Sequence, residues 1–400
     1  MSFLSRNKIL ASILVTLLVG TSLPAAAEGA AKEQFNQALN AYQQQDYPTA
    51  LRLWLPLAQQ GNAQAQFNLG LMYANGQGVD PNDQQAAEWF SKAAQQDDAQ
   101  AQFNLGLMYE KGRGVSQDDH HAVEWYRKAA QQGRDRAQLN LGFMYEEGRG
   151  VSKDNQQAFE WYRKAAQQGN SQAQFNLGLM YTEGRGISKN DQQAVEWYRK
   201  AAQQGHATAQ YNLGWMYAEG RGVNQDDRQA IEWFRRAADQ SHADAQYNLG
   251  LMYAEGRGSS QDNRQAVEWY RKAAQQGLAP AQNNLGLMYK QGRGVKQDYN
   301  QAAEWFFKAT QQGLANAQFN LGNMYAHGWG VNQDDKQAVE LFHKAAQQGD
   351  ANAQAILGGM YYLGRGVHQD QRQAIDWLRK AAAKGQQDAI KMLKALQLNP

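Results

Sequence analysis

The sequence predicts an all-α protein, a solenoid of stacked helical hairpins, and three observations lead to this fold class. The pair Leu-Gly returns every 36 residues without a slip. Each copy holds two stretches whose apolar and small residues follow helical spacing, with a glycine-rich turn between them. A helical pattern at this period is typical of repeat proteins, in which each copy packs only on its neighbours. The recurring glycines are Gly70, Gly106, Gly142, Gly178, Gly214, Gly250, Gly286, Gly322 and Gly358.

The copy at residues 98–133 illustrates the two helices of one hairpin. Its first half brings Ala101 and Leu105 onto one face, and the Gly-Arg-Gly turn at 112–114 then interrupts the helical pattern. Gly133 supplies the stop after the second helix. The second helix places on one face Ala122, Trp125, Tyr126, Ala129 and Ala130.

Stacking of the hairpins must supply most of the stability, because helices of about a dozen residues are marginal alone. Gly106 lies within a predicted helix, where it costs about 1 kcal/mol relative to Ala. We expect the missing side chain to offset this by letting the partner helix approach closely. A tryptophan series on the second helices is expected to pack between repeats: Trp89, Trp125, Trp161, Trp197, Trp233, Trp269 and Trp305.

The first 27 residues have the three zones of a secretory signal peptide. Arg6 and Lys8 form a basic start, residues 9–19 are apolar, and the segment ends in small residues at 25–27. Eleven residues make a helix of about 16 Å, too short for a hydrocarbon core of roughly 30 Å. The sequence therefore predicts cleavage after Ala27, with an uncleaved anchor as the alternative, and a periplasmic or secreted mature chain.

Three motifs recur from copy to copy: A-x-x-x-L-G-x-x-Y, the G-R-G-V turn, and Q-A-V-E-W-Y-R-K-A-A-Q-Q-G. With them the chain resembles the Sel1-like repeat family, which is related to the tetratricopeptide repeats, and looks like an exported bacterial-type member. The resemblance implies a right-handed α/α solenoid whose first helices line a concave face, and it implies no particular reaction. The nine expected repeats are 62–97, 98–133, 134–169, 170–205, 206–241, 242–277, 278–313, 314–349 and 350–385.

The ends of the repeat array differ from its interior. Residues 28–61 predict a tetratricopeptide-like hairpin with a shorter turn, since Tyr42 and Tyr73 are separated by 31 residues rather than 36. Residues 386–400 repeat only a first helix. Terminal units of a solenoid need a polar outer face, so we expect both segments to be caps.

Charge and cysteine content exclude several classes of function. Beyond residue 27 the chain has 38 basic and 38 acidic residues, which argues against a nucleic-acid partner because such binding depends on clustered Lys and Arg. The chain has no Cys, which removes disulfides, thiol nucleophiles and Cys-ligated zinc. We predict no cofactor, no metal site and no stable membrane insertion after signal cleavage, while the oligomeric state stays open.

The remaining polar side chains also suggest no catalytic site. We expect solvated surface histidines and helix-capping roles for acidic pairs such as Asp118-Asp119. We expect the Arg of each turn to form a solvated or salt-bridged ridge, with nearby residues such as Glu110 as partners. Some cysteine-rich relatives of the family are linked with beta-lactams, but this chain has neither Cys nor a Ser-x-x-Lys motif. We therefore predict that it is not an enzyme.

The residue before Leu-Gly is Asn in eight copies, and only Ile356 breaks the series. In the similar tetratricopeptide peptide-binders, an Asn at this place faces the concave groove and holds a peptide, and a primary amide both donates and accepts. Aromatic residues flank the central members. The candidate peptide-binding residues are Asn140, Asn176, Asn212, Asn248, Phe143, Phe175, Tyr211, Trp215 and Tyr247.

Two interpretations of the Asn ladder stay open. Its members either contact a ligand or bond to neighbouring repeats, and duplication alone repeats residues. The favoured function is an exported, non-catalytic scaffold that binds a protein or extended peptide on its concave face, in envelope assembly or in contact with a host. The alternatives are a structural spacer and, less favoured, an envelope enzyme that binds or hydrolyses a beta-lactam.

Overall fold

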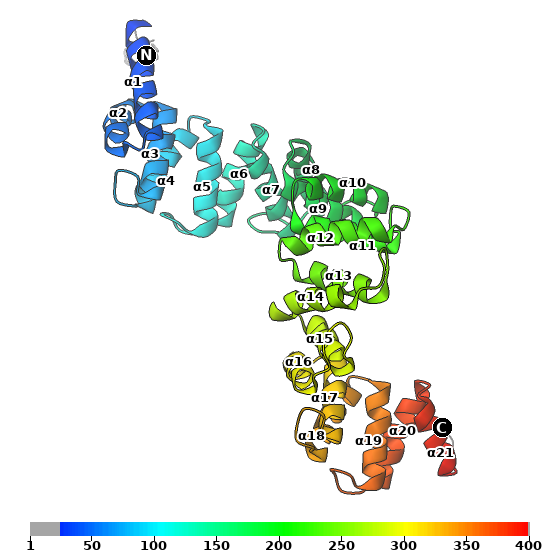
Figure 1. Cartoon of the computed structure of the whole chain (residues 1–400). Coiled ribbons are helices and arrows are strands. Elements are labelled where there is room, and N and C mark those ends of the chain that lie inside the picture. The colour runs from blue at the N-terminus through cyan, green and yellow to red at the C-terminus, as the bar shows by residue number, and fades with distance from the viewer. Residues whose placement is uncertain (1–24, 399–400) are drawn as a thin grey trace, which may run out of the picture. The chain divides into compact units, whose positions relative to one another are not determined.

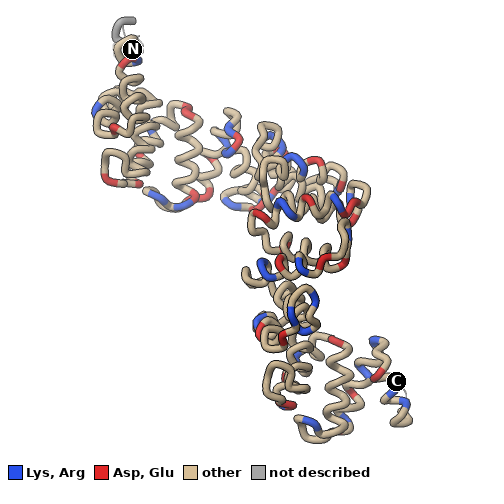
Figure 2. Tube along the Cα trace, viewed as in Figure 1, with Lys and Arg blue, Asp and Glu red and all other residues tan. Residues whose placement is uncertain are grey.

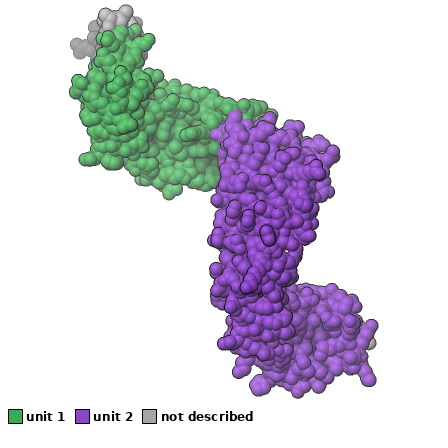
Figure 3. All heavy atoms as spheres, in the orientation of Figure 1, with its two compact units in different colours: residues 1–168 green, residues 169–400 purple. Residues whose placement is uncertain are grey.

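The structure is a computed structural model that describes residues 25–398, and these form helices and turns with no strand (Figure 1). The signal peptide expected from the sequence therefore lies largely outside the described residues. The chain divides into two compact units, residues 1–168 and 169–400 (Figure 3). None of the helices in residues 25–398 has the length and apolar character needed to cross a bilayer.

The first unit holds four hairpins. Its helices are α1 Ala25–Gln43, α2 Tyr47–Gln59, α3 Ala63–Asn75, α4 Asp83–Ala94, α5 Ala99–Lys111, α6 Asp119–Gln131, α7 Asp135–Glu147 and α8 Asn155–Gln167. In the hairpin of α1 and α2, the rings of Phe35 and Trp54 lie 5.9 Å apart, and Trp54 is buried. Each hairpin of this unit then packs on the next.

The second unit holds six hairpins and a final single helix. Its helices are α9 Ser171–Glu183, α10 Asp191–Gln203, α11 Ala207–Glu219, α12 Asp227–Asp239, α13 Ala243–Glu255, α14 Asn263–Gln275, α15 Ala279–Gln291, α16 Tyr299–Gln311, α17 Ala315–His327, α18 Asp335–Gln347, α19 Ala351–Leu363, α20 Gln371–Ala383 and α21 Gln387–Ala395. The all-α solenoid of consecutive helical hairpins is confirmed.

Helix ends follow the local chemistry of the repeat. Asp118 precedes α6, and its carboxylate accepts a hydrogen bond from the His121 N–H at 3.0 Å, which confirms the predicted cap. Gly112 follows α5 with φ of 64°, in the left-handed region that favours glycine. Its N–H bonds to the Met108 carbonyl and ends the helix there.

Close approach of the two helices in a hairpin depends on the Leu-Gly glycine. A Cβ atom on Gly106 would lie 2.7 Å from the Tyr126 ring, well inside van der Waals contact. Tyr126 has no exposed surface, because its ring occupies this space against α5. The expected role of Gly106 is therefore confirmed.

Tryptophans of the second helices pack against the preceding hairpin, as the sequence predicts. Trp125 of α6 packs against the core formed by α4 and α5, and Trp233 of α12 packs against the core of α10 and α11. A basic side chain one turn later lies over each of these rings, Lys128 over Trp125 and Arg236 over Trp233. The Lys128 ammonium lies 4.2 Å from the centre of the Trp125 ring, a cation–π contact.

A buried glutamine in each first helix joins neighbouring hairpins, and the sequence analysis missed it. Gln102 is fully buried, and its amide donates to the Ala94 carbonyl at 3.1 Å. Its side-chain oxygen accepts from the Gln132 amide, 30 residues later, at 2.9 Å. The same pair of bonds joins Gln246 to the Ala238 carbonyl and to Gln276. These amides satisfy backbone carbonyls that the helix ends leave open.

Candidate peptide-binding face

The candidate binding residues all lie on first helices, and we call the surface they occupy the first-helix face. Asn140 and Phe143 belong to α7 in the first unit, whereas the other seven belong to α9, α11 and α13 in the second unit. The four asparagines are half-buried. Phe143 is 42% exposed, so its ring is the most open of the aromatic candidates.

The asparagines form bonds within and between repeats. Asn248 donates to the Asp244 carbonyl of its own helix at 3.0 Å and lies 3.5 Å from the Tyr211 hydroxyl of the preceding repeat. The amide of Asn176 accepts from Gln172 at 3.0 Å. Each amide that donates has a second N–H and an oxygen for further partners. These bonds fit a structural role and leave capacity for a ligand, so the ligand role of the ladder stays a prediction.

The aromatic candidates rest on the second helices of their own hairpins. Ring centres lie 6.0 Å apart for Phe175 and Tyr198 and 5.8 Å apart for Tyr211 and Phe234. Burial raises the pKa of Tyr211, so its hydroxyl is neutral at physiological pH. One face of each ring is therefore part of the hairpin core.

Two histidines stack on the rings of Phe175 and Tyr211, which corrects the expectation of solvated surface histidines for these two positions. His206 stacks on Phe175 with ring centres 4.6 Å apart, and His242 stacks on Tyr211 at 4.8 Å. His206 also caps α11, because its Nδ1 accepts from the Ala209 N–H at 3.2 Å. Burial lowers the pKa of both histidines. Each is thus a neutral cap that joins two repeats.

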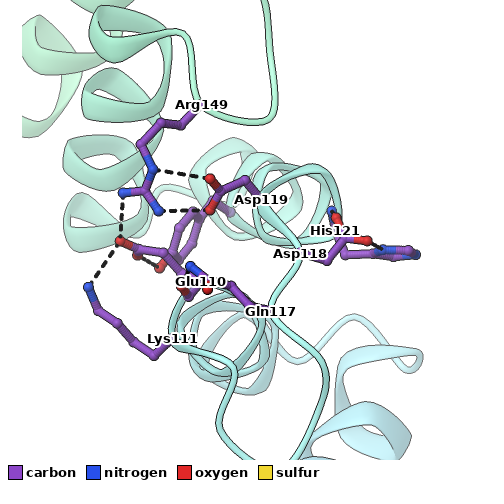
Figure 4. A network of polar contacts seen from close by, with 8 residues as sticks. Glu110, Lys111, Gln117, Asp118, Asp119, His121 and Arg149 are labelled. Carbon is purple, nitrogen blue, oxygen red and sulfur yellow. Dashed lines mark hydrogen bonds and ion pairs between the residues drawn. The ribbon is translucent and has the colours of Figure 1, made fainter.

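The turn arginines find partners in the preceding repeat (Figure 4). The guanidinium of Arg149 makes two hydrogen bonds to Asp119, at 2.7 and 3.1 Å, and a third to Glu110 at 3.2 Å. Burial tends to raise the pKa of Glu110, but hydrogen bonds from Tyr126, Lys111 and Arg149 outweigh it and lower that pKa. The carboxylate stays charged within this cluster.

Aspartate is the usual partner of these arginines, and the predicted glutamates pair with two of them, Glu110 with Arg149 and Glu183 with Arg185. Arg221 binds Asp191 at 2.7 Å and Arg257 binds Asp227 at 2.8 Å, in both cases the first residue of the preceding repeat's second helix. The ridge is therefore salt-bridged and joins hairpins. Lysines and arginines alternate with acidic residues along the trace of both units (Figure 2).

A cleft of about 270 Å³ opens on the first-helix face of the first unit. Phe67 of α3 and Phe103 of α5 provide its apolar part, and both rings are half-buried. Arg134 and Arg136, at the start of α7, provide two positive charges. The remaining lining residues are Gln100, Asn104 and Asp135. None of the nine candidate peptide-binding residues lies in this cleft, although Asn104 belongs to the same ladder.

The first-helix face, the paired hairpins and the bonds at a constant spacing define a repeat protein of the α/α solenoid class. The Sel1 repeat model matches nine consecutive segments: 63–98, 99–133, 135–170, 171–206, 207–242, 243–278, 279–314, 315–350 and 351–386. The chain therefore belongs to the Sel1 repeat family. Within residues 25–398, no three His, Asp or Glu side chains gather closely enough to hold a metal ion.

Two solved structures are similar over most of their length. One is c5321, a protective antigen present in uropathogenic Escherichia coli strains, with 37% identity, a TM-score of 0.68, and coverage of 93% of this chain and 90% of that one. The other is a Sel1 repeat protein from Oxalobacter formigenes, with 36% identity, a TM-score of 0.61, and coverage of 78% and 90%. Among curated proteins, none matches this chain.

Proposed function

We propose that the chain is an exported, non-catalytic scaffold that binds a protein or an extended peptide along its first-helix face. The observation that carries this proposal is the recurrence, on that one face, of half-buried amides beside aromatic side chains. An amide-lined apolar surface suits a peptide, whose backbone needs both donors and acceptors and whose side chains need apolar contacts. The Sel1 repeat solenoid is a fold typical of protein–protein interaction scaffolds, which supports the proposal.

Export is part of the proposal. The similar E. coli protein is described as a protective antigen, and this description supports the proposal of export. We propose that the mature chain begins at Glu28 and acts in the periplasm or outside the cell, in envelope assembly or in contact with a host. Mass spectrometry of the functional pool is expected to find Glu28 at its amino terminus, and an intact Met1 would refute export by cleavage.

Photo-crosslinking from two phenylalanines tests the binding face. Phe143 lies on first helix α7 and is 42% exposed, while Phe307 lies on second helix α16 and is 51% exposed. A benzophenone amino acid placed at each position in turn gives probes of similar exposure on different helix types. We expect discrete crosslinked proteins from position 143 in envelope or host extracts and none from position 307. Equal crosslinking from both positions would contradict a binding face.

Replacement of two ladder members tests the amides directly. Asn176→Ala with Asn212→Ala removes ligand contacts of about 1 kcal/mol each, or roughly a thirtyfold loss of affinity for the crosslinked partner. The melting temperature is expected to change little. If the double variant has a lower melting temperature but binds its partner with normal affinity, the Asn ladder has a structural role.

The structural spacer is a second candidate, and one observation favours it. Phe175 and Tyr211 each pack against an aromatic ring of the second helix and stack against a histidine, which reduces the ring surface that a ligand could contact. A spacer predicts that neither crosslinking position captures a partner and that the Asn variants alter stability alone.

A further inference from the structure

We propose that the cleft between α3, α5 and α7 is a specificity site that selects an acidic peptide segment carrying an aromatic residue. The inference rests on the proposed function, because it assigns partner chemistry to one part of the first-helix face. Four side chains carry it: Phe67, Phe103, Arg134 and Arg136.

The two arginines are exceptions within the repeat pattern. The position of Arg134 holds Asn62, Asp98, Asn170, His206, His242, Leu278, Leu314 and Asp350 in the other repeats. The position of Arg136 holds Gln64, Gln100, Gln172, Thr208, Asp244, Pro280, Asn316 and Asn352. No other repeat has Lys or Arg at either place, so the paired guanidinium charge is specific to this cleft.

Arg134 also gives up a structural role that most other repeats keep. It occupies the N-cap of α7 but makes no side-chain hydrogen bond to the helix, whereas Asn62 and Asn170 at the same place cap theirs. Loss of a good cap destabilises a helix, because one of its first N–H groups is left without a partner. Arg134 thus weakens its own helix while its side chain lines the cleft, which indicates a role in the cleft rather than in the helix.

Both guanidinium groups are available to a ligand. Among the described residues, neither Arg134 nor Arg136 has an ion pair or a side-chain hydrogen bond, in contrast to Arg149 and its two acidic partners. Asp135 is the only acidic residue in the lining, so the cleft carries a net charge of +1. Carboxylates are the natural complement, because guanidinium groups bind them with paired hydrogen bonds.

The apolar part of the cleft favours a peptide over a simple anion. Phe67 and Phe103 are half-buried and line the same cavity as the arginines. Its volume of about 270 Å³ lies just below the roughly 300–1,000 Å³ range of small-molecule sites and suits a few side chains. Asn104 donates to the Gln100 carbonyl at 2.9 Å and keeps its amide oxygen for a peptide N–H.

Fluorescence polarisation with matched peptides tests the site on the full chain. The probe is fluorescein-labelled Gly-Ser-Asp-Phe-Glu-Ser-Gly with an amidated carboxyl end, and its neutral counterpart is Gly-Ser-Asn-Phe-Gln-Ser-Gly. We expect the acidic peptide to bind at least tenfold more tightly, with a preference that weakens as salt rises. Equal affinity of the two peptides, or binding of neither at 1 mM, would overturn the proposal.

The matched variant restores the residues of other repeats. Arg134→Asn with Arg136→Gln is expected to remove the acidic preference while raising the melting temperature, because α7 gains a cap. A structural role for the arginines predicts the opposite change in stability. The control Arg228→Gln with Arg264→Gln removes two exposed charges at second helices and is expected to leave binding unchanged. Loss of the preference in that control, or its persistence in the Arg134/Arg136 variant, would overturn the site.

Two further outcomes separate the acidic-peptide site from non-specific binding and from the scaffold function alone. A single-stranded oligonucleotide of the same charge that binds as tightly as the acidic peptide would indicate non-specific polyanion binding and overturn the proposal. Crosslinking at position 143 that is unchanged in the Arg134/Arg136 variant would leave the scaffold function standing while the acidic specificity fails.

Discussion

Tyr299 stacks on Trp329 with ring centres 5.8 Å apart, at the place where most other repeats have an aspartate and an arginine. The spacing of 30 residues is the same as that of Asp119 and Arg149. Lys290 lies 5.2 Å from the centre of the Trp329 ring, in the position that Glu110 holds toward Arg149. One repeat junction has therefore exchanged an ion-pair cluster for an aromatic and cation–π cluster.

This exchange predicts strong coupling between the two aromatic residues. Trp329→Arg alone loses the stack and places a second positive charge near Lys290, so we expect it to destabilise the chain by about 1–2 kcal/mol. Adding Tyr299→Asp and Lys290→Ala rebuilds the junction found at Ala218, Asp227 and Arg257, and is expected to recover most of the loss. Urea unfolding of the single and triple variants measures the coupling, and additive effects would contradict it.

In the last repeat, the side-chain bond that joins Gln102 to Gln132 in an earlier repeat has no equivalent. The buried side-chain oxygen of Gln354 has no hydrogen-bond partner, because position 384 is Lys and its ammonium donates to the Gly349 carbonyl instead. Gln348 shows that a glutamine at this place bonds both to a carbonyl and to the buried amide.

Lys384→Gln is therefore expected to stabilise the carboxyl end by about 1 kcal/mol, through one added buried hydrogen bond. Calorimetry should show a higher melting temperature for this variant. Arg379→Gln, which removes an equal charge from an exposed position of α20, serves as the control. If the melting temperature does not rise in Lys384→Gln, the missing hydrogen bond to Gln354 does not limit the stability of this end.

Two adjacent glycines in α19 predict opposite effects of the same substitution. A Cβ atom on Gly358 would lie 2.8 Å from Leu378 and 3.1 Å from the Ala374 carbonyl, while one on Gly359 would meet nothing within 4 Å. Gly359→Ala gains helix propensity and is expected to stabilise by about 0.5–1 kcal/mol. Gly358→Ala is expected to destabilise by about 1–3 kcal/mol through overpacking. Thermal unfolding of the pair checks both signs, and similar shifts would refute the close approach.

The neutral histidine caps predict a loss of stability in mild acid. Burial lowers the folded-state pKa of His206 and His242 below the ordinary value of 6.5, so the unfolded chain binds protons first as pH falls. Their contribution is complete above about pH 6.5 and is lost as pH falls toward the lowered pKa.

Asn170 caps α9 at the position equivalent to His206 and His242. Replacing both histidines by Asn therefore keeps a helix cap that does not titrate. We expect the double variant to lose less stability than the parent chain between pH 7 and pH 5, as measured by urea unfolding at each pH. Identical pH profiles would show that these histidines do not set the acid response. His368→Asn in an exposed turn is the control.

The sequence predicted what is local and periodic. Spacing alone identified the hairpin, the close approach at Gly106 and the Asp118 cap, because these depend on residues a few positions apart or on one helix facing its partner. It predicted Glu110 as a partner of the turn arginines but missed Asp119, which makes two hydrogen bonds to Arg149, since Asp119 lies 30 residues upstream. It also missed Gln102, because an amide at a buried position resembles a surface residue until its bonds are known.

The candidate site was less accessible to sequence reasoning. Recurrence drew attention to the Asn ladder, and recurrence cannot reveal a site that one repeat alone possesses. The signal for the cleft was the departure of Arg134 and Arg136 from the residues usual at their positions. The stacking of His206 on Phe175 depends on how closely two hairpins meet, and spacing does not report that distance.

The bonds within and between hairpins have one further consequence, which concerns how the chain lengthens and folds. The Gln102–Gln132 contact within a hairpin and the Asp119–Arg149 contact between two hairpins both join residues 30 positions apart, so each closes a short loop whatever the total length of the chain. Loss or gain of a whole period by recombination within the gene leaves every such bond with an equivalent partner. Contact order thus stays low as the array grows, and folding can start at any hairpin and spread to its neighbours.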